Sequence, residues 1–359
     1  MKASVINEFG KPLVWEDVET PVPDPDQVLV QVMACGIDGT DLKILDGFGY
    51  HPTLPAIIGH EIAGVVAEVG KNVTDFKPGN RVIVYNFTTC GKCLLCLTQR
   101  EQICENLIAV VGVRPEGSGY AEYLTISPKQ LVRLPDNISW PDAAVCCDAV
   151  ITSVHSLDRA RLKLGETVLV IGTGGVGSMT LQLTKIAGAR VIAVNQSKDR
   201  EQWSFDNSAD EVLDSSKMDI PAAVRELTDG MGVDCVLDIV GNTSTMTDGI
   251  NSLRHGGRLV IVGYTQEKYP LEGKYIAQNE LEIIGTRCGR KQDLINSVKL
   301  MADGKIKSIV TEIYPMEKAN EALTSLRSGK TLGRTVLMTP ACLLYTSDAA
   351  DERSSVDLG

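Results

Sequence analysis

Four cysteines within one short stretch have the spacing of metal ligands. Cys90, Cys93, Cys96 and Cys104 follow one another at intervals of 3, 3 and 8 residues. Four thiolates on one loop can close a tetrahedron around Zn²⁺, with Zn–S distances near about 2.3 Å. A closed Cys₄ site has no open coordination position, so the sequence predicts a structural zinc. The alternative, four free thiols in one loop, would leave reactive groups exposed.

A second candidate metal site centres on His60, which lies in Gly59-His60-Glu61. An isolated histidine is more often an ordinary core residue than a ligand. Here, however, Asp38, Asp148 and the adjacent Glu61 come from stretches that could converge on it. Imidazole nitrogen and carboxylate oxygen are both zinc ligands. The alternative is a polar cleft without metal, in which Asp38 and Asp148 only form hydrogen bonds.

A glycine-rich turn indicates nucleotide binding. The run Gly172-Thr173-Gly174-Gly175-Val176-Gly177 fits G-x-G-x-x-G and follows an apolar, β-branched stretch, Val168–Ile171. A helix is expected over Met179–Ala187, ending at Gly188, and a second buried strand over Arg190–Val194. In this context the glycines allow a tight turn and close approach to a pyrophosphate, which the helix N-terminus attracts. We therefore expect Gly172, Gly174, Gly175, Val176 and Gly177 to bind a dinucleotide.

One position suggests which nicotinamide cofactor is used. About 20 residues after the fingerprint, NAD enzymes place an acidic residue against the ribose 2′-hydroxyl. Here that position is Asn195, which would not repel a 2′-phosphate, and Ser197, Lys198 and Arg200 could bind one. The sequence therefore favours NADP(H) over NAD(H). Alternatively, Lys198 and Arg200 are solvated residues at a helix start, and the specificity is loose.

The surrounding pattern predicts two domains. Residues 1–151 contain short Val/Ile runs punctuated by Gly and Pro, which is typical of a mostly β unit. Residues 152–285 alternate between helix and strand and predict an α/β fold with a doubly wound parallel sheet. Residues 286–341, with helices near 293–302 and 316–328 and a strand at 334–338, are expected to return to the first domain. The expected strands of the second domain are Val168–Ile171, Arg190–Val194, Cys235–Ile239, Arg258–Val262 and Leu281–Ile284.

Bulk properties narrow the range of functions. The 359 residues carry a formal net charge of −11, which argues against nucleic-acid or anionic-membrane partners. We see neither a membrane-length apolar run nor a signal peptide, and expect a cytoplasmic protein whose cysteines are not paired in disulfides. Residues 342–359 resemble a translated sequencing-library adapter, and we assign this tail no fold or function.

Taken together, these motifs resemble the zinc-dependent medium-chain alcohol dehydrogenases. The pattern G-H-E-x2-G-x5-G at residues 59–70, the Cys₄ loop and the glycine fingerprint occur in that family's order, and the resemblance spans residues 1–338. It implies a GroES-like catalytic domain, a Rossmann domain and an active site in the cleft between them. It further implies interconversion of a small-molecule alcohol, polyol or sugar with its carbonyl compound, and a homodimer or homotetramer.

The resemblance also implies roles for single residues. Asp38 stands where the family usually has a cysteine ligand, and Asp148 at the third ligand position. The predicted catalytic zinc set is therefore Asp38, His60 and Asp148, with water or Glu61 in the remaining position. These oxygen ligands are harder than thiolates, which should weaken discrimination against other divalent metals.

Four further residues match family positions. Thr40 matches a proton-relay hydroxyl, and Lys43 occupies the place where many relatives have a relay histidine, although an exposed lysine without that role is equally compatible. Thr152 matches a residue beside the nicotinamide. Arg334 matches an arginine that reaches the cofactor phosphates.

Two other functions remain compatible with the sequence. One is a metal-free NADPH-dependent enone or quinone reductase on the same fold, although such relatives usually lack both G-H-E and the Cys₄ loop. The other is a non-catalytic NAD(P)-binding sensor, against which the intact Thr40 and the possible ligand set argue.

Overall fold

The computed structural model describes residues 1–113 and 117–342. By its internal contacts the chain forms two compact units. The first contains Met1–Asp148, Met301–Asp303 and the described residues from Val310 onward, and the second contains Ala149–Leu300 and Gly304–Ile309. Except for Cys342, the expected adapter-like tail lies outside the described residues. No described helix has both the length and the apolar content that a membrane span requires.

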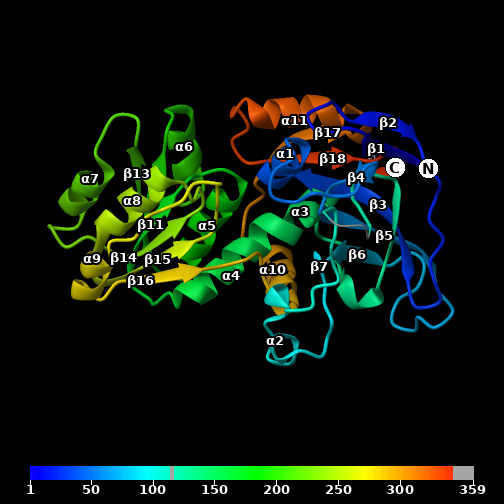
Figure 1. Cartoon of the computed structure of the whole chain (residues 1–359), viewed down its shortest axis with the longest axis horizontal. Helices are drawn as coiled ribbons and strands as arrows, with labels where there is room; N and C mark the ends of the chain where they lie inside the picture. The colour runs from blue at the N-terminus through cyan, green and yellow to red at the C-terminus, as the bar shows by residue number, and fades with distance from the viewer. Residues whose placement is uncertain (114–116, 343–359) are drawn as a thin grey trace, which may run out of the picture. The chain divides into compact units, whose positions relative to one another are not determined.

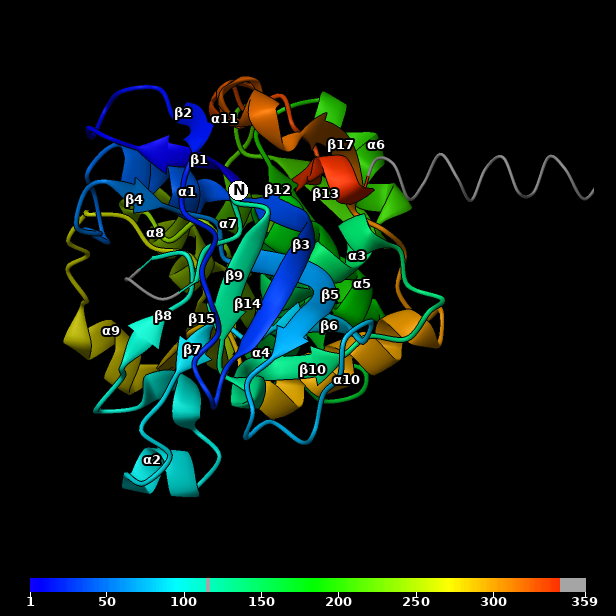
Figure 2. The same ribbon diagram turned by 90° about the vertical axis from the view of Figure 1, so that its right-hand side faces the viewer.

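The first unit is mostly β-structure. Its largest sheet has the order β10-β6-β5-β3-β18-β17, with β9 also paired to β3, and Figure 2 shows β9, β3, β5 and β6 side by side. Strand β3 lies at the centre because its apolar run is almost fully buried. A three-stranded sheet, β2-β1-β4, and a two-stranded ribbon, β7-β8, complete the set. The strands are β1 (Lys2–Ile6), β2 (Val14–Asp17), β3 (Val28–Ile37), β4 (Ala56–Ile57), β5 (Glu61–Val69), β6 (Arg81–Val84), β7 (Phe87–Thr88), β8 (Ala109–Val110), β9 (Tyr123–Ile126), β10 (Leu131–Arg133), β17 (Val310–Pro315) and β18 (Arg334–Met338).

Short helices connect these strands. The segment that carries α2 projects away from the strands of its own unit (Figures 1 and 2). The α-helices of this unit are α1 (Gly39–Leu45), α2 (Leu94–Leu97), α3 (Trp140–Val145) and α11 (Ala319–Arg327), and the 3₁₀ turns are η1 (Glu101–Ile103), η2 (Pro128–Gln130) and η4 (Met316–Lys318). A π-helical turn, η3 (Cys146–Val150), joins α3 to α4 (Ile151–Ala160) at the boundary between the units.

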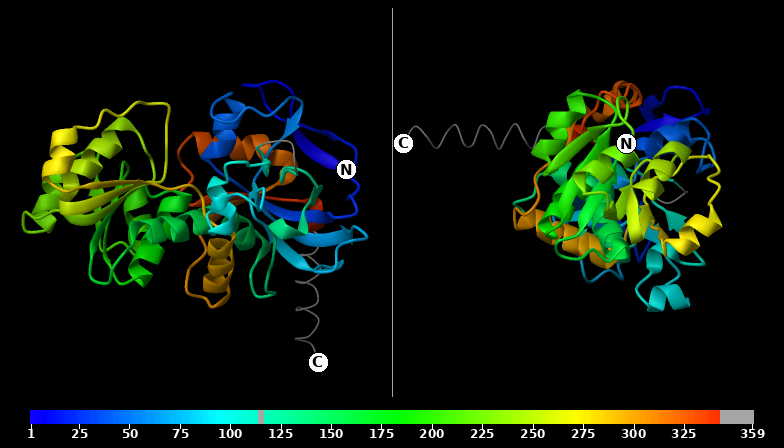
Figure 3. Two further views of the ribbon diagram at one scale, coloured as in Figure 1. Left: turned by 60° about the horizontal axis from the view of Figure 1, so that its bottom comes forward. Right: turned by 90° about the vertical axis from the view of Figure 1, so that its left-hand side faces the viewer.

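The second unit is a six-stranded parallel sheet of order β13-β12-β11-β14-β15-β16. Its green-to-yellow strands and helices face the viewer in the right panel of Figure 3. The strands are β11 (Thr167–Ile171), β12 (Arg190–Asn195), β13 (Glu211–Asp214), β14 (Val233–Asp238), β15 (Leu253–Ile261) and β16 (Glu282–Gly285). The helices are α4, α5 (Gly175–Ile186), α6 (Asp199–Asp206), α7 (Ile220–Leu227), α8 (Thr243–Ser252), α9 (Gly273–Gln278) and α10 (Lys291–Ala302). The predicted α/β class with a doubly wound sheet is confirmed.

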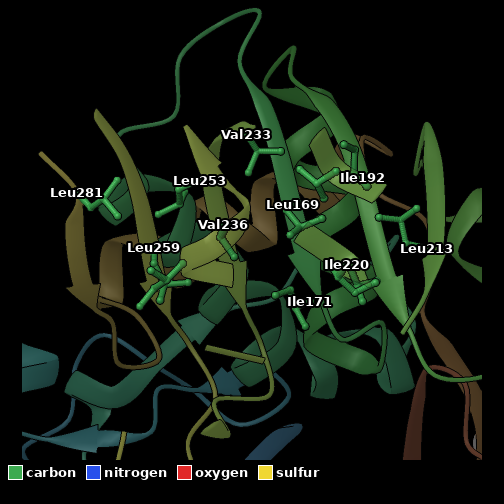
Figure 4. Close-up of a cluster of buried hydrophobic side chains, with 13 residues drawn as sticks. Leu169, Ile171, Ile192, Leu213, Ile220, Val233, Val236, Leu253, Leu259 and Leu281 are labelled. Carbon is green, nitrogen blue, oxygen red and sulfur yellow. The ribbon is translucent and has the colours of Figure 1, made fainter. Parts of the chain in front are cut away.

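Alternate residues of each central strand enter different cores, because successive side chains of a strand point to opposite faces. Leu169 and Ile171 pack with α7 and α8, and Figure 4 shows them beside Val236. Val168 and Val170 belong to the other cluster, with Leu181 of α5. Both faces of the sheet are therefore buried, which explains why β11 is a continuous apolar run.

The structure departs from the predicted elements in four places. Strands β13 and β17 were not anticipated. Helix α5 begins at Gly175 rather than Met179, because the tight turn already ends at Gly174, which is the N-cap of the helix. Helix α10 lies in the second unit up to Leu300, so the return to the first unit does not begin at residue 286 as expected.

Candidate active site and metal centres

His60 and Glu61 are fixed at the buried start of β5. They are 6% and 0% exposed, respectively. The preceding Gly59 has φ +99°, and a Cβ at that position would lie 2.3 Å from the Tyr120 ring. Only glycine therefore lets the chain turn past Tyr120 and direct His60 and Glu61 into the unit's interior.

Asp38 is held rigidly as the N-cap of α1. Its carboxylate accepts hydrogen bonds from the Thr40 backbone N–H at 2.7 Å and from the Thr40 hydroxyl at 3.0 Å. The Asp41 carboxylate in turn accepts the Asp38 backbone N–H at 3.0 Å, which completes a capping box. The predicted ligand Asp38 and the predicted relay residue Thr40 are thus in direct contact.

The imidazole of His60 lies between two carboxylates. Its Nε2 is 3.8 Å from Asp38 Oδ1, and its Nδ1 is 3.7 Å from Asp41 Oδ1. Asp41 is fully buried and was not singled out from the sequence, although its position three residues after the cap was a usable signal. An acid on the ring nitrogen remote from Asp38 can fix the tautomer and orientation of a ligating histidine.

Asp148 reaches this group from the π-helical turn η3. Single-turn π-helices often occur at functional sites, because the extra residue rotates side chains out of the regular helical register. Arg334, at the start of β18, contacts both Asp148 and Glu61, with ion-pair distances of 2.5 and 2.6 Å. The structure therefore places Arg334 among the acids of the first unit. Its predicted contact with cofactor phosphates stays a prediction.

The predicted catalytic ligands come together. Asp38, His60, Glu61 and Asp148 each offer one donor atom, and these atoms all lie within 4.8 Å of one another. Glu61 Oε2 is buried without a hydrogen-bond partner among the described residues, whereas Glu61 Oε1 faces Arg334. A buried polar atom that lacks a partner calls for an explanation, and a cation beside it supplies one. The donor set therefore fits a divalent metal ion.

The electrostatics of the group are dominated by negative charge. Burial raises the pKa of Glu61 well above its usual value, although the Arg334 guanidinium opposes this shift. For His60, burial disfavours protonation, but Asp38 and Asp41 outweigh it and raise the pKa well above the ordinary value. The His60 shift indicates surroundings that favour positive charge.

The backbone of Gly36 lies close to the Glu61 side chain. Gly36 of β3 lies directly opposite Glu61 of β5, and a Cβ on Gly36 would lie 1.8 Å from Glu61 Oε2. We expect Gly36→Ala to displace the Glu61 carboxylate, to lower the free energy of unfolding by about 1–3 kcal/mol and to reduce activity. Urea unfolding and steady-state kinetics measure both effects.

The matched control for this prediction is Gly39→Ala. A Cβ on Gly39 meets no atom within 4 Å, so its free energy of unfolding should stay within about 1 kcal/mol of the original. Equal stability of the Gly36 and Gly39 variants would contradict the predicted clash.

The four predicted structural-zinc ligands also come together. Their sulfurs are separated by 3.5 Å (Cys93–Cys96), 3.6 Å (Cys104–Cys90), 3.8 Å (Cys93–Cys104) and 3.9 Å (Cys90–Cys96). Tetrahedral Zn–S bonds of about 2.3 Å place sulfurs roughly 3.8 Å apart. All four are free cysteines, so the arrangement is not explained by disulfides. This group fits a closed zinc site.

The glycine fingerprint has the expected form in the second unit. Gly172 has φ +94° at the end of β11, and a Cβ on Gly177 would lie 1.9 Å from the Gly172 carbonyl oxygen. The helix that follows starts at Gly175, and its N-cap, Gly174, makes no side-chain cap. The first N–H groups of α5 are therefore available to an anion.

Residues predicted to contact the cofactor ribose lie at the end of β12. The Asn195 carboxamide oxygen accepts the Ser197 N–H at 3.3 Å, whereas its buried Nδ2 has no partner among the described residues. The half-buried Arg200 donates to the Thr173 carbonyl at 3.3 Å, which ties α6 to the glycine turn. Lys198 is the N-cap of α6, and Thr152 is buried near the start of α4.

Comparison with known proteins assigns the family. Residues 24–136 match the model of the alcohol dehydrogenase GroES-like domain, and residues 175–303 match that of the zinc-binding dehydrogenases. The chain belongs to the zinc-dependent medium-chain alcohol dehydrogenases. It is an NAD(P)-dependent enzyme of that class, as the sequence predicted.

Relatives of this dehydrogenase differ in cofactor. An NAD-dependent alcohol dehydrogenase of Sulfolobus acidocaldarius is 35% identical, over 94% of this chain and 99% of the relative. A D-arabinose 1-dehydrogenase (NADP(+)) of Saccharolobus solfataricus is 31% identical, over 94% and 97%. The alcohol dehydrogenase structure from Aeropyrum pernix has a TM-score of 0.88 and 32% identity, covering 94% of this chain and all of that one.

Proposed function

We propose that this dehydrogenase interconverts an alcohol, polyol or sugar with its aldehyde or ketone at a divalent metal centre. Asp38, His60 and Asp148 hold the ion, with Glu61 or water at the remaining position. The observation that carries the proposal is the convergence of these four donors within 4.8 Å. We further propose that Cys90, Cys93, Cys96 and Cys104 hold a second, structural zinc.

The chemistry divides between the ion, the cofactor and the chain. A bound divalent ion lowers the pKa of a substrate hydroxyl and polarises a carbonyl. In oxidation the substrate loses a hydride to C4 of the nicotinamide and a proton to the protein. We assign the relay of that proton to Thr40, whose hydroxyl donates to the carboxylate of the proposed ligand Asp38. Lys43 is the other residue that we propose for this relay, and burial lowers its pKa.

Two other functions make different predictions about metal content. A reductase without a catalytic metal and a non-catalytic sensor would each carry about one zinc per chain, in the Cys₄ site. The proposed enzyme carries about two, one in the closed Cys₄ site and one in a catalytic site with an open coordination position. Metal analysis, together with a panel of primary, secondary and sugar alcohols offered with both cofactors, tests the proposal. One zinc per chain and no oxidation of any alcohol would contradict it.

We also propose that the cofactor is NADP(H). Asn195 offers an unpartnered N–H group at the end of β12 and carries no charge that would repel a 2′-phosphate. Asp214 of β13 is the partner of Asn195 in the strand pairing, and its carboxylate forms an ion pair with Lys217 at 2.5 Å. Ser197, Lys198 and Arg200 supply further donors.

The cofactor prediction is tested by one substitution. Wild-type kcat/KM should be higher with NADPH than with NADH. Asn195→Asp should reduce kcat/KM with NADPH by about tenfold or more, because the new carboxylate would lie beside the negatively charged 2′-phosphate. Asn251→Asp, at an exposed position of α8, is the control that should leave the ratio unchanged. A strong wild-type preference for NADH would refute the prediction.

A homodimer or homotetramer is our proposal for the assembly, and it rests on the family resemblance.

A further inference from the structure

The two metal-ligand groups of this chain have opposite donor chemistry. The loop site offers four sulfurs, whereas the Asp38–His60–Glu61–Asp148 group offers one nitrogen and three carboxylate oxygens. Thiolates select zinc and other soft ions, whereas carboxylates suit harder ions such as Mn²⁺ and Mg²⁺. The same chain therefore presents two sites that should differ in which ions they retain.

The cysteines near the oxygen-rich group face backbone carbonyls. Cys147, which precedes Asp148, donates its thiol to the Ile62 carbonyl at 3.3 Å. Cys35 lies in β3, and its thiol faces the Gly36 carbonyl at 3.5 Å. Neither cysteine belongs to the Asp38–His60–Glu61–Asp148 group, whose donor atoms lie within 4.8 Å of one another. The described residues therefore supply this centre with no sulfur ligand.

The charge around the group also favours a strongly ionic bond. Asp38, Asp41 and Glu61 are buried and Asp148 is partly buried, and the Arg334 guanidinium contacts Glu61 and Asp148. A hard divalent cation gains most from such surroundings, because its bonds to oxygen are largely electrostatic.

We infer that the Asp38–His60–Glu61–Asp148 centre exchanges its ion readily and binds Mn²⁺ as well as Zn²⁺, whereas the Cys₄ site keeps zinc. The inference rests on the proposed function, because it takes this group to be a metal centre. It goes further by stating that the two aspartates set the choice of ion, of which Asp38 stands where the family usually has a cysteine.

The experiment uses the full chain and does not depend on activity. Dialysis against a chelator should lower the zinc content from about two to about one per chain, because only the closed sulfur site retains its ion. Titration with MnCl₂, followed by the electron paramagnetic resonance signal of free Mn²⁺, should then show about one bound ion per chain. Co²⁺ added to the same protein should give weak absorption bands without a sulfur-to-cobalt charge-transfer band.

A variant with sulfur ligands provides the matched comparison. In Asp38→Cys/Asp148→Cys, Mn²⁺ affinity should fall by roughly tenfold or more, and the Co²⁺ spectrum should gain the charge-transfer band. Asp136→Asn, whose side chain is 98% exposed, should bind Mn²⁺ like the original chain. The wild-type titration stands by itself if the cysteine variant does not fold.

The outcomes separate this inference from the proposed function. If zinc rebinds to the dialysed chain but Mn²⁺ does not, the inference is overturned and the metal-dependent function stands. Unchanged Mn²⁺ affinity in the folded cysteine variant also overturns it. If neither ion rebinds to the dialysed chain, the proposed function falls with it.

Discussion

Asp148→Asn is expected to abolish alcohol oxidation while leaving the protein folded. The substitution keeps the size of the side chain but removes the charge from a proposed metal ligand that the Arg334 guanidinium also contacts. A metal ion contributes several kcal/mol to stabilising charge in the transition state, which corresponds to a factor of about one hundred or more in kcat. Measured zinc should fall by about one per chain, because the open site loses an anionic ligand while the sulfur site is untouched.

Two controls distinguish the loss of a metal ligand in Asp148→Asn from unfolding of the protein. Retention of the Cys₄ zinc reports on the loop of residues 90–104, and circular dichroism reports on the fold of the whole chain. Asp136→Asn changes an exposed carboxylate of the same unit and should keep full activity. If Asp148→Asn retained both its zinc and its activity, the negative charge of Asp148 would not be required to hold the ion, and its assignment as an anionic ligand would fail.

Local features of the fold were predictable from the sequence. Strand β11 and the glycine turn were recognisable because a buried parallel strand is a continuous apolar run and the turn needs glycine at fixed offsets. The short strands β13 and β17 were not predicted. Strand β13 has four residues, two of them acidic, and only Leu213 among them is buried. The partly exposed β17 ends in Pro315 and owes its place to pairing with β18.

The site was predictable as a set of residues but not as a set of contacts. Asp38, His60 and Asp148 could be named because their types suit a metal and their positions match the ligand positions of the family. The bridge from Arg334 to Glu61 and Asp148 joins residues far apart in the chain, and no spacing in the sequence encodes it. Asp41 was missed for a related reason, since its contact with His60 depends on the capping box that begins α1.

In the loop between Cys90 and Cys104, the proposed zinc would take the place of a hydrophobic core. Its regular structure is limited to α2, with four residues, and η1, with three. Leu94 and Leu97 of α2 are 72% and 70% exposed, so they contribute little apolar burial. A segment of this kind cannot offset its conformational entropy by packing alone, which indicates that zinc binding supplies the missing stability.

Cys96→Ser is therefore expected to release the structural zinc and unfold this loop. The Cys96 sulfur lies 3.5 Å from that of Cys93 and 3.9 Å from that of Cys90, and serine cannot supply the thiolate. Structural zinc contributes on the order of 10 kcal/mol to folding in small zinc domains, so amides of residues 90–104 should lose nearly all protection from hydrogen exchange. Cys288→Ser, a partly exposed cysteine outside both metal groups, should leave zinc content and exchange unchanged. Persistent protection of the loop in Cys96→Ser would mean that contacts with the rest of the first unit, rather than the metal, hold it in place.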